Sequence, residues 1–295
     1  MTFETQRLIL RPWREEDAEN LFFYAKDPDV GYPAGWPAHT SVQNSREIIE
    51  TVLSAPETYA VCLKENNKAI GSVGLKMGTA TDLTDREDEC ELGYWIGKPF
   101  WGQGLIPEAC REILHHAFED LNMQTVWCGY YDGNIKSRRV QEKLGFTYHH
   151  STENIEVPLL NESRKGYVMV LKREDYEAKQ LFGTTDAYKE YINKTANYTS
   201  KNWQMATEGL NAIFKKFAQC LKNGFSAESV SAQELVKELK NFITENYYTC
   251  TNEILAGLGQ MYAADERFKE NIDKQGSGTA EFAAEAIRIY TNTQY

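Results

Sequence analysis

Two glycines, Gly102 and Gly104, stand two residues apart between a strand-like run and a helix-like run. Glycine lets the backbone turn so that successive amides point to one place, and a helix N-terminus adds the positive end of its dipole. A phosphate group is a ligand that such a turn binds well. The spacing therefore predicts an anion site at the start of a helix.

The elements that must position this turn follow from their composition. Residues 92–97 are rich in aromatic and β-branched side chains, which is typical of a buried strand. Pro107 suits the first turn of a helix, and Glu108 suits its positive end. An apolar stripe recurs every four residues at Ala109, Ile113, Ala117 and Leu121. We therefore expect a strand, a glycine turn and a helix, in that order.

Two nucleotide-binding motifs do not fit this turn. A dinucleotide fingerprint needs a third glycine, but Pro107 stands there, and no acidic residue that ends a next strand follows at the required distance. A Walker-type loop needs lysine and then serine or threonine, where Leu105 and Ile106 follow instead. An ordinary glycine-rich connection is the structural alternative for this loop taken alone.

A second patch begins with a predicted strand over residues 125–131 and a turn at Asp132-Gly133. Asn134 is placed to cap a short helix over residues 135–144, and Gly145 ends that helix before another strand. The two patches lie about 30 residues apart and share the same strand, turn and helix order.

Both patches resemble the GNAT acyl-CoA transferases. The family's pyrophosphate loop has Arg or Gln, two residues, Gly, one residue, then Gly or Ala; Gly102 and Gly104 match, and Pro99 replaces the Arg or Gln. A second family pattern is matched by Asn134, Ser137, Lys143, Gly145 and Phe146. The opening residues 4–13 resemble the first strand of the branch that contains ribosomal-protein alanine acetyltransferases. The resemblance covers about residues 1–175, our predicted first domain.

This resemblance implies an α/β (α+β) GNAT fold, in which a mixed and mostly antiparallel sheet is flanked by helices. It implies acetyl-CoA as the cofactor and an N-acetyl transfer to a primary amine of a protein N-terminus, a small molecule or a drug. The implied oxyanion donor is a backbone amide close to Ile96. The implied cofactor contacts are Ile96, Trp101, Gly102, Gln103, Gly104, Leu105, Asn134 and Ser137.

The implied chemistry also needs a base for the amine and an acid for the thiolate. In the family the base is often a carboxylate on the strand before the loop, and strand alternation puts Glu91 on the face that Gly93 and Trp95 share. Glu91 is our candidate base and Glu89 is second, with a solvent-facing carboxylate as the alternative.

The acid is less well defined by the sequence. Many family members carry a tyrosine just before the Glu-Lys pair, but Gln141 occupies that position. Ser137 is therefore the candidate that would hydrogen-bond the thiolate. Its alternative is a hydroxyl on the helix surface, because some relatives work without a dedicated acid.

Substrate choice is expected to come from the turn-rich segment 31–41. We expect Trp36 and His39 to line the amine pocket together with Tyr94 and Tyr130. The alternative for Trp36 is that it anchors the loop to the core.

Composition sets wider limits. The net charge of −11 over 295 residues disfavours nucleic acid and anionic membranes as partners. Apolar runs are too short to span a bilayer and a signal peptide is not apparent, so we expect a cytoplasmic protein. The cysteines lack paired spacing, which favours reduced core thiols over a metal site, and we expect no metal. They are Cys62, Cys90, Cys110, Cys128, Cys220 and Cys250.

Beyond about residue 172 the pattern becomes helical throughout, and we expect five or six helices. One apolar stripe runs from Trp203 to Leu221 and closes at Gly224. A capping box is predicted at Ser231 to Glu234, and Asp265 is predicted to cap a short helix. Residues 176–295 form our predicted second, all-helical domain.

Several segments of this part, among them residues 182–188, 247–251 and 259–268, resemble the TipAS antibiotic-recognition domain. The resemblance implies a globin-like module that binds bulky peptide antibiotics such as thiopeptides. Relatives are usually fused to the DNA-binding part of a transcription activator, whereas here a transferase takes that place. The candidate antibiotic contacts are Tyr248, Cys250, Tyr262, Phe268 and Phe282, with core packing and a quiet buried thiol as the alternatives.

Two functions therefore compete for the whole chain. The first is an acetyl-CoA-dependent N-acetyltransferase whose helical domain presents, senses or stabilises. The second is an antibiotic-binding or sequestering protein with a vestigial transferase. The presence of Gly102, Gly104 and Asn134 favours the first. The acceptor and the oligomeric state, a homodimer included, stay open.

Overall fold

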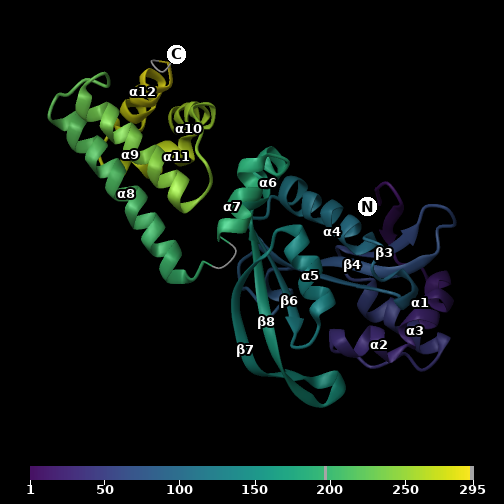
Figure 1. Ribbon diagram of the computed structural model, residues 1–295. Helices are drawn as coiled ribbons and strands as arrows, with labels where there is room; N and C mark the ends of the chain where they lie inside the picture. Colours follow the sequence, from purple (N-terminus) through teal and green to yellow (C-terminus); the bar gives the residue numbers. More distant parts are fainter. Residues whose placement is uncertain (196–197, 293–295) are drawn as a thin grey trace. The chain divides into compact units, whose positions relative to one another are not determined.

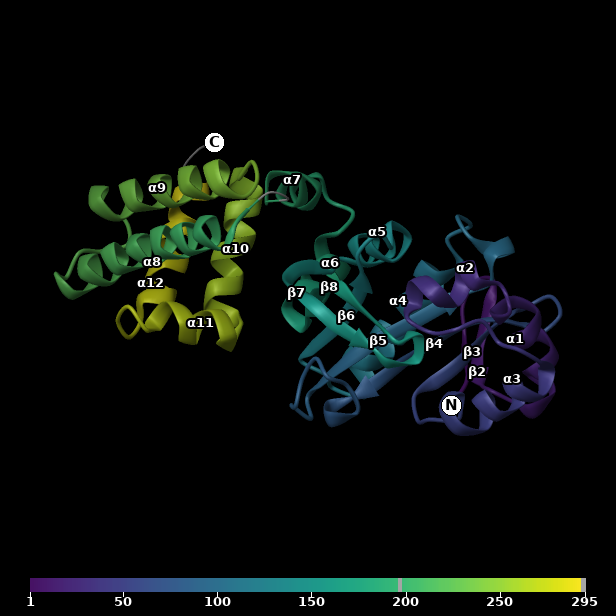
Figure 2. The same cartoon turned by 90° about the horizontal axis from the view of Figure 1, so that it is seen from below.

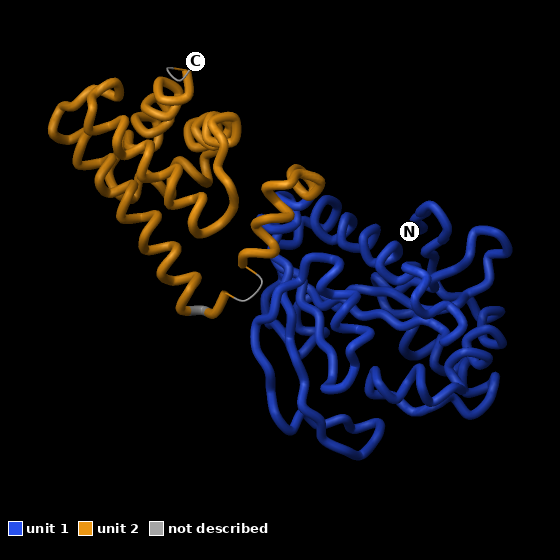
Figure 3. The backbone as a smooth tube through the Cα atoms, viewed as in Figure 1, with its two compact units in different colours: residues 1–179 blue, residues 180–295 orange. Residues whose placement is uncertain are grey.

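The computed structural model describes residues 1–195 and 198–292, which form two compact units (Figures 1 and 3). The first unit comprises Met1–Lys179 and the second begins at Gln180. The two units thus separate four residues after our predicted domain boundary, which itself stays a prediction. Within the described ranges, every helix lacks the length or the apolar content that crossing a bilayer requires.

The first unit is built on one eight-stranded sheet (Figures 1 and 2). The strand order is β1-β2-β3-β4-β5-β6-β8-β7, and only β5 and β6 pair in parallel. The strands are β1 (Phe3–Glu4), β2 (Leu8–Pro12), β3 (Thr58–Leu63), β4 (Ala69–Met77), β5 (Glu89–Ile96), β6 (Thr125–Tyr131), β7 (Thr147–Val157) and β8 (Glu162–Lys172). This confirms the expected mixed, mostly antiparallel sheet.

Helices lie on both faces of this sheet. They are α1 (Ala18–Ala25), α2 (Pro28–Gly31), α3 (Val42–Ile48), α4 (Leu105–His115), α5 (Ile135–Leu144) and α6 (Arg173–Phe182). Alternation along β3 sends Tyr59 and Val61 to the core that contains α4, and sends Ala60 and Cys62 to a second core that contains α1. The sheet is therefore the middle layer between two sets of helices.

The elements around the glycine turn match their predicted bounds closely. β6 and α5 span the predicted residues 125–131 and 135–144, and β5 begins three residues before the predicted strand. The helix after the turn starts at Leu105 and continues beyond His115 as a π-helical stretch, His116–Asp120. The expected strand, turn and helix order is confirmed twice.

Helix α6 packs its first two turns into the first unit. The Tyr176 ring stacks on Phe118 with 4.5 Å between centroids. Lys179 Nζ donates to the carbonyl of Lys143, in the last turn of α5, at 2.8 Å. These two contacts explain why the compact units separate after Lys179 rather than at the start of α6.

The described part of the second unit is helical beyond the end of α6. Its helices are α7 (Asp186–Thr195), α8 (Ser200–Lys222), α9 (Val230–Asn246), α10 (Asn252–Ala264), α11 (Glu266–Asp273) and α12 (Thr279–Asn292). Asp265 caps α11, as predicted. The capping box predicted at Ser231 is wrong, because α9 begins at Val230 and the Ser229 side chain accepts from the Ala232 amide.

Candidate active site

A split opens in the sheet between β5 and β6. The two strands pair at only three positions, and the last pair is Glu91 with Trp127. Beyond that pair both strands continue, and within the described residues they form no further ladder pairs, although Cys128 Sγ donates to the Leu92 carbonyl at 3.1 Å. We call the opening between Leu92–Ile96 and Cys128–Tyr131 the split. Parallel strands that part in this way leave backbone groups facing the gap.

The register of β4 and β5 shows which backbone groups face the split. The Gly97 amide donates to the Ile70 carbonyl at 2.8 Å, so this pair occupies a hydrogen-bonded position of the ladder. Its neighbour Ile96, opposite Gly71, therefore directs its N–H and C=O away from β4. The Ile96 carbonyl accepts from Trp101 Nε1 at 2.9 Å. The Ile96 amide thus points to the split, where the predicted oxyanion donor is needed.

The glycine turn lies at the end of β5, where α4 starts. Gly102 and Gly104 both have left-handed φ values, 76° and 75°, which other residues rarely adopt. A Cβ built on Gly102 meets nothing within 4 Å, so its backbone is open to an approaching group. The free amides of the first turn of α4 follow directly. The turn therefore has the shape and the electrostatics of an anion cradle.

Arg7 and Glu108 fix this turn from the side. Arg7 Nη1 donates to the Gln103 carbonyl at 3.0 Å, and Arg7 Nη2 pairs with Glu108 at 2.7 Å. Burial alone would raise the pKa of Glu108, but hydrogen bonds from Thr5 and Arg7 lower it. Sequence analysis missed Arg7, because a contact across about a hundred residues leaves no local signal.

Asn134, Lys136 and Ser137 join the start of α5 to other parts of the site. The Asn134 side chain accepts from the Ser137 amide at 3.2 Å, as a helix cap does, and donates to the Pro33 carbonyl at 3.1 Å. Ser137 follows in the first turn of α5, and its hydroxyl lies 3.0 Å from Tyr94 Oη across the split. Lys136 Nζ lies 3.4 Å above the Trp101 ring. The start of α5 is thereby tied to β5 and to the loop before α4.

The two candidate bases differ in how strongly they are engaged. Glu89 accepts from Trp127 Nε1 and Thr84 Oγ1, each at 2.7 Å, and its other oxygen pairs with Arg86. The contacts of Glu91 within the described residues, Thr81 Oγ1 at 2.5 Å and Lys76 Nζ at 3.5 Å, reach only Oε2. Glu91 therefore keeps Oε1 for a proton, which favours it as the base.

The residues predicted for the amine pocket fall on two faces. The Trp36 ring packs against Trp95 and His39 at 5.8 and 5.5 Å, on the face that Glu91 shares. Tyr94 and Tyr130 instead pack against the core that contains α4. Trp36 also contacts the second core, which fits the anchoring alternative. A pocket made by all four residues stays a prediction.

His39 and the open space at Gly93 lie on the face of the sheet that Glu91 shares. Burial lowers the pKa of His39, and its Nδ1 lies 2.7 Å from Ser45 Oγ, so the ring is neutral at pH 7. A Cβ built on Gly93 meets nothing within 4 Å, which leaves room on the sheet next to Glu91.

Contacts that sequence analysis missed hold the predicted acceptor loop. Arg164 lies over the rings of Tyr32 and Tyr131 at 4.1 and 5.2 Å. Its Nη1 donates to the Tyr32 carbonyl at 2.6 Å, and Tyr32 Oη donates to Glu162 at 3.0 Å. The loop is therefore fixed to the start of β8 by contacts that span more than a hundred residues, and Arg164 also contacts Tyr131 at the end of β6.

In the second unit, the residues predicted to contact an antibiotic differ in how deeply they are buried. Cys250 and Tyr262 are core residues, and Tyr248 and Phe282 are half-buried against that core. Phe268 is 38% exposed. Burial raises the pKa of Cys250 to about 11 and that of Tyr248 to about 12. The alternative of core packing fits Tyr262, and the alternative of a quiet buried thiol fits Cys250.

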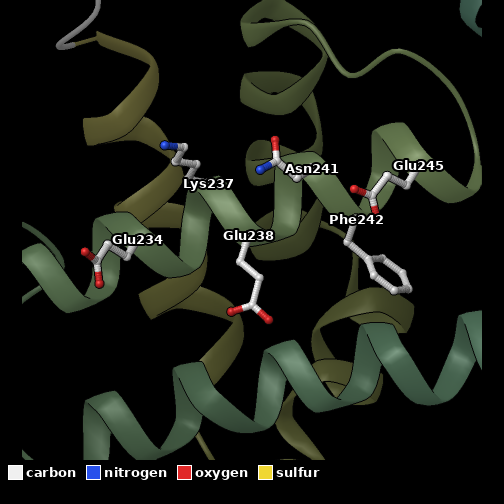
Figure 4. Close-up of a pocket in the computed structure, with 6 residues that line it drawn as sticks. All are labelled: Glu234, Lys237, Glu238, Asn241, Phe242 and Glu245. Atoms are coloured by element: carbon white, nitrogen blue, oxygen red, sulfur yellow. The ribbon is translucent and has the colours of Figure 1, made fainter.

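Two other surface features of this unit were not predicted. An open groove of about 440 Å³ runs along α9, and none of the predicted contacts lines it (Figure 4). It is lined by Glu234, Lys237, Glu238, Asn241, Phe242 and Glu245. An aromatic cluster is formed by residues of α7, of α8 and the segment just before it, and of α9 and the residue just after it. Its neighbouring rings have centroids 5.2 to 6.4 Å apart and belong to Tyr188, Tyr191, Tyr198, Trp203, Phe242 and Tyr247.

Comparisons with known proteins assign both parts of the chain. Residues 7–147 match the acetyltransferase (GNAT) domain model, and residues 175–290 match the TipAS antibiotic-recognition domain model. An uncharacterized N-acetyltransferase, p20 of Bacillus licheniformis, is 28% identical over 150 residues, which cover 49% of this chain and 82% of p20. The HTH-type transcriptional activator TipA of Streptomyces coelicolor is 34% identical over 111 residues, 38% of this chain and 44% of TipA.

Solved structures agree on the fold of the first unit. A GNAT-family acetyltransferase from Bacillus anthracis aligns with a TM-score of 0.52 and 21% identity, over 59% of this chain and 99% of that one. The chain spans less than half the length of the TipA and mta activators that it matches. It combines a GNAT acetyltransferase domain with a TipAS antibiotic-recognition domain.

Proposed function

We propose that this protein is an N-acetyltransferase that moves the acetyl group of acetyl-CoA to a primary amine. The observation that carries the proposal is the split, with the Ile96 amide facing it and the glycine turn at its end. An elongated cofactor needs both features, because its pyrophosphate binds at the turn while its thioester reaches between the strands. The Gly102 backbone, open on its Cβ side, fits the first requirement.

The chemistry divides between the two faces of β5. The amine nitrogen attacks the thioester carbonyl, so a C–N bond forms, the C–S bond breaks and the sulfur leaves as a thiolate. Glu91 takes the proton that the amine loses, directly or through water. The Ile96 amide donates to the carbonyl oxygen as negative charge develops there. Ser137 donates a hydrogen bond to the sulfur, and the thiolate takes, through water, the second proton that the nitrogen loses once the C–N bond has formed, so the products are an amide and CoA.

The test is thiol release from acetyl-CoA by the full chain with a panel of amines: peptides with a free N-terminus, polyamines and amine-bearing drugs. We expect release that depends on one class of amine and on the presence of Gly104. A chain that binds acetyl-CoA but transfers to none of these amines would support the alternative of a vestigial transferase.

We also propose that the helical unit binds a rigid aromatic peptide antibiotic such as a thiopeptide. The supporting observation is the aromatic cluster, in which Trp203 is 38% exposed and borders Tyr191 and Tyr198. Aromatic faces stack on flat heterocycles, and such stacking adds to apolar burial. Calorimetry of the full chain with thiostrepton tests this role, and heat of binding that Trp203→Ala abolishes is the expected result.

A further inference from the structure

A small hydrogen-bond network connects the two edges of the split on the side opposite Glu91. Ser137 Oγ lies 3.0 Å from Tyr94 Oη and 3.1 Å from Gln141 Nε2. Gln141 Nε2 also donates to the Gly129 carbonyl of β6 at 3.1 Å. The network therefore runs from β5 through the first turns of α5 to β6, and Ser137 Oγ is its central atom.

The direction of the bond from Gln141 is fixed by its partners. A carbonyl such as that of Gly129 only accepts, so the side-chain atom that faces it must be the NH₂ group. The second hydrogen of that group then points to Ser137 Oγ. Reversing the amide would set two oxygens against each other. Ser137 Oγ is thus an acceptor for Gln141.

The single hydrogen of Tyr94 has two oxygen acceptors within hydrogen-bond distance, both on Ser137, and the buried Cys128 thiol is a further neighbour of the phenol. One acceptor is the Ser137 carbonyl at 3.1 Å and the other is Ser137 Oγ at 3.0 Å. In the first arrangement the Ser137 hydroxyl donates its hydrogen bond to Tyr94 Oη, so its proton stays within the network. In the second arrangement Ser137 Oγ accepts twice, so its own proton must point elsewhere. A sulfur anion in the split favours the second arrangement, because a charged acceptor makes the stronger hydrogen bond.

We propose that Tyr94 and Gln141 are positioning residues that direct the Ser137 hydroxyl proton to the sulfur of coenzyme A. No proton is transferred in this step, because only the O–H bonds of Tyr94 and Ser137 rotate. The inference rests on the proposed acetyltransferase function and deepens it. Gln141 stands where many relatives carry a tyrosine. In this chain the phenol comes instead from Tyr94 of β5, and the inference gives Tyr94 and Gln141 a shared role.

Burial supports this assignment. Burial raises the pKa of Tyr94 well above its ordinary value, so the phenol remains a donor throughout the range in which a thiol titrates. Gln141 is fully buried, and its Oε1 has no hydrogen-bond partner among the described residues. An unpaired buried oxygen is unfavourable, and an apolar side chain of the same shape would avoid it. The donor bond to Ser137 gives a reason for an amide at this position.

The test measures the acidity of the CoA thiol when CoA is bound to the full chain. The thiolate absorbs in the ultraviolet, and the complex with desulfo-CoA supplies the background, so no acceptor amine is needed. Donation from Ser137 stabilises the thiolate, so we expect the acid dissociation constant of the bound thiol to fall by about 3- to 10-fold in Tyr94→Phe, and in Gln141→Leu, relative to the unaltered chain.

The double variant and a matched control separate positioning from general damage. Because both residues act through Ser137, Tyr94→Phe should have no further effect in a Ser137→Ala background. Tyr59→Phe is the control, since Tyr59 is also a buried tyrosine, hydrogen-bonded to Glu57 in the same core, and it should leave the thiol unchanged.

The outcomes distinguish the inference from the function on which it rests. If the unaltered chain does not bind CoA, the proposed function fails and the inference fails with it. If CoA binds normally but the thiol titrates alike in the unaltered chain, Tyr94→Phe and Gln141→Leu, the inference alone is overturned. An effect of Tyr94→Phe that persists in full without the Ser137 hydroxyl would also overturn it. If Tyr94→Phe does not fold, Gln141→Leu serves as the test instead, because it removes the other hydrogen-bond donor to Ser137 Oγ.

Discussion

Glu91 and Tyr94 are three residues apart on β5, yet their polar atoms lie on opposite faces of the sheet. Glu91 bonds Thr81 on one face, whereas the Tyr94 hydroxyl bonds Ser137 of α5 on the other. Strand alternation alone produces this separation. In the mechanism that we propose, the amine proton leaves on one side of the split while the sulfur is stabilised on the other, so the two tasks do not compete for one group.

The cofactor turn is tested by Gly104→Val. A β-branched side chain at φ 75° is strained, and it would also enter the space that a pyrophosphate needs. We expect acetyl-CoA binding to be lost in calorimetry while circular dichroism shows a folded chain. Gly224→Val is a matched control, because Gly224 has φ 74° and open space around it but lies in the helical unit. Equal loss in both variants would argue against a specific role for the turn.

The base is tested by Glu91→Gln. With acetyl-CoA bound, we expect the transfer rate to fall by ~10²-fold or more, because the charged amine keeps its proton. The loss should shrink as pH rises through the pKa of the amine, since the amine then deprotonates without help. Glu89→Gln is the comparison, and we expect a smaller effect because Glu89 is held by Trp127, Thr84 and Arg86. A pH–rate profile unchanged by Glu91→Gln would remove Glu91 from the mechanism.

Cys250 is expected to be unreactive in the native chain. Its pKa of about 11 leaves a thiolate fraction of ~10⁻³ at pH 8, far below that of a free cysteine, and the thiolate is the reacting form. Iodoacetamide followed by mass spectrometry should label Cys250 only after denaturation. Labelling within minutes in the native chain would instead support a reactive thiol in the antibiotic site.

Measurements of the melting temperature with and without ligand distinguish core residues from ligand-binding residues in the helical unit. Tyr262 is buried, so Tyr262→Ala should destabilise the unit by about 3–5 kcal/mol and lower its melting temperature without ligand. Phe268 and Trp203 are each 38% exposed, and their alanine variants should lower the melting temperature less than Tyr262→Ala does. Thiostrepton at 100 times its Kd should stabilise the unaltered chain by about 2.7 kcal/mol. If Trp203→Ala kept that full shift, the aromatic cluster would not be the binding surface.

Features that local chemistry controls were predictable from the sequence. Helix α5 has its predicted bounds because Asn134 caps it and Gly145, with φ 102°, ends it. The cap of α9 was misplaced by two residues, because Ser229 and Ser231 are both suitable caps and only packing selects between them. The contacts of Arg7 with Gln103 and of Arg164 with Tyr32 could not be predicted, because they depend on how the sheet brings distant segments together.

The central claim is that acetyl transfer takes place in the split between β5 and β6. The most direct measurement is thiol release from acetyl-CoA by the full chain across the amine panel, with mass spectrometry of the acceptor. We predict release that matches the acetylated amine mole for mole, and its loss in Gly104→Val but not in Gly224→Val. Tight binding of acetyl-CoA without any acetylated product, at pH values on both sides of the amine pKa, would contradict the account.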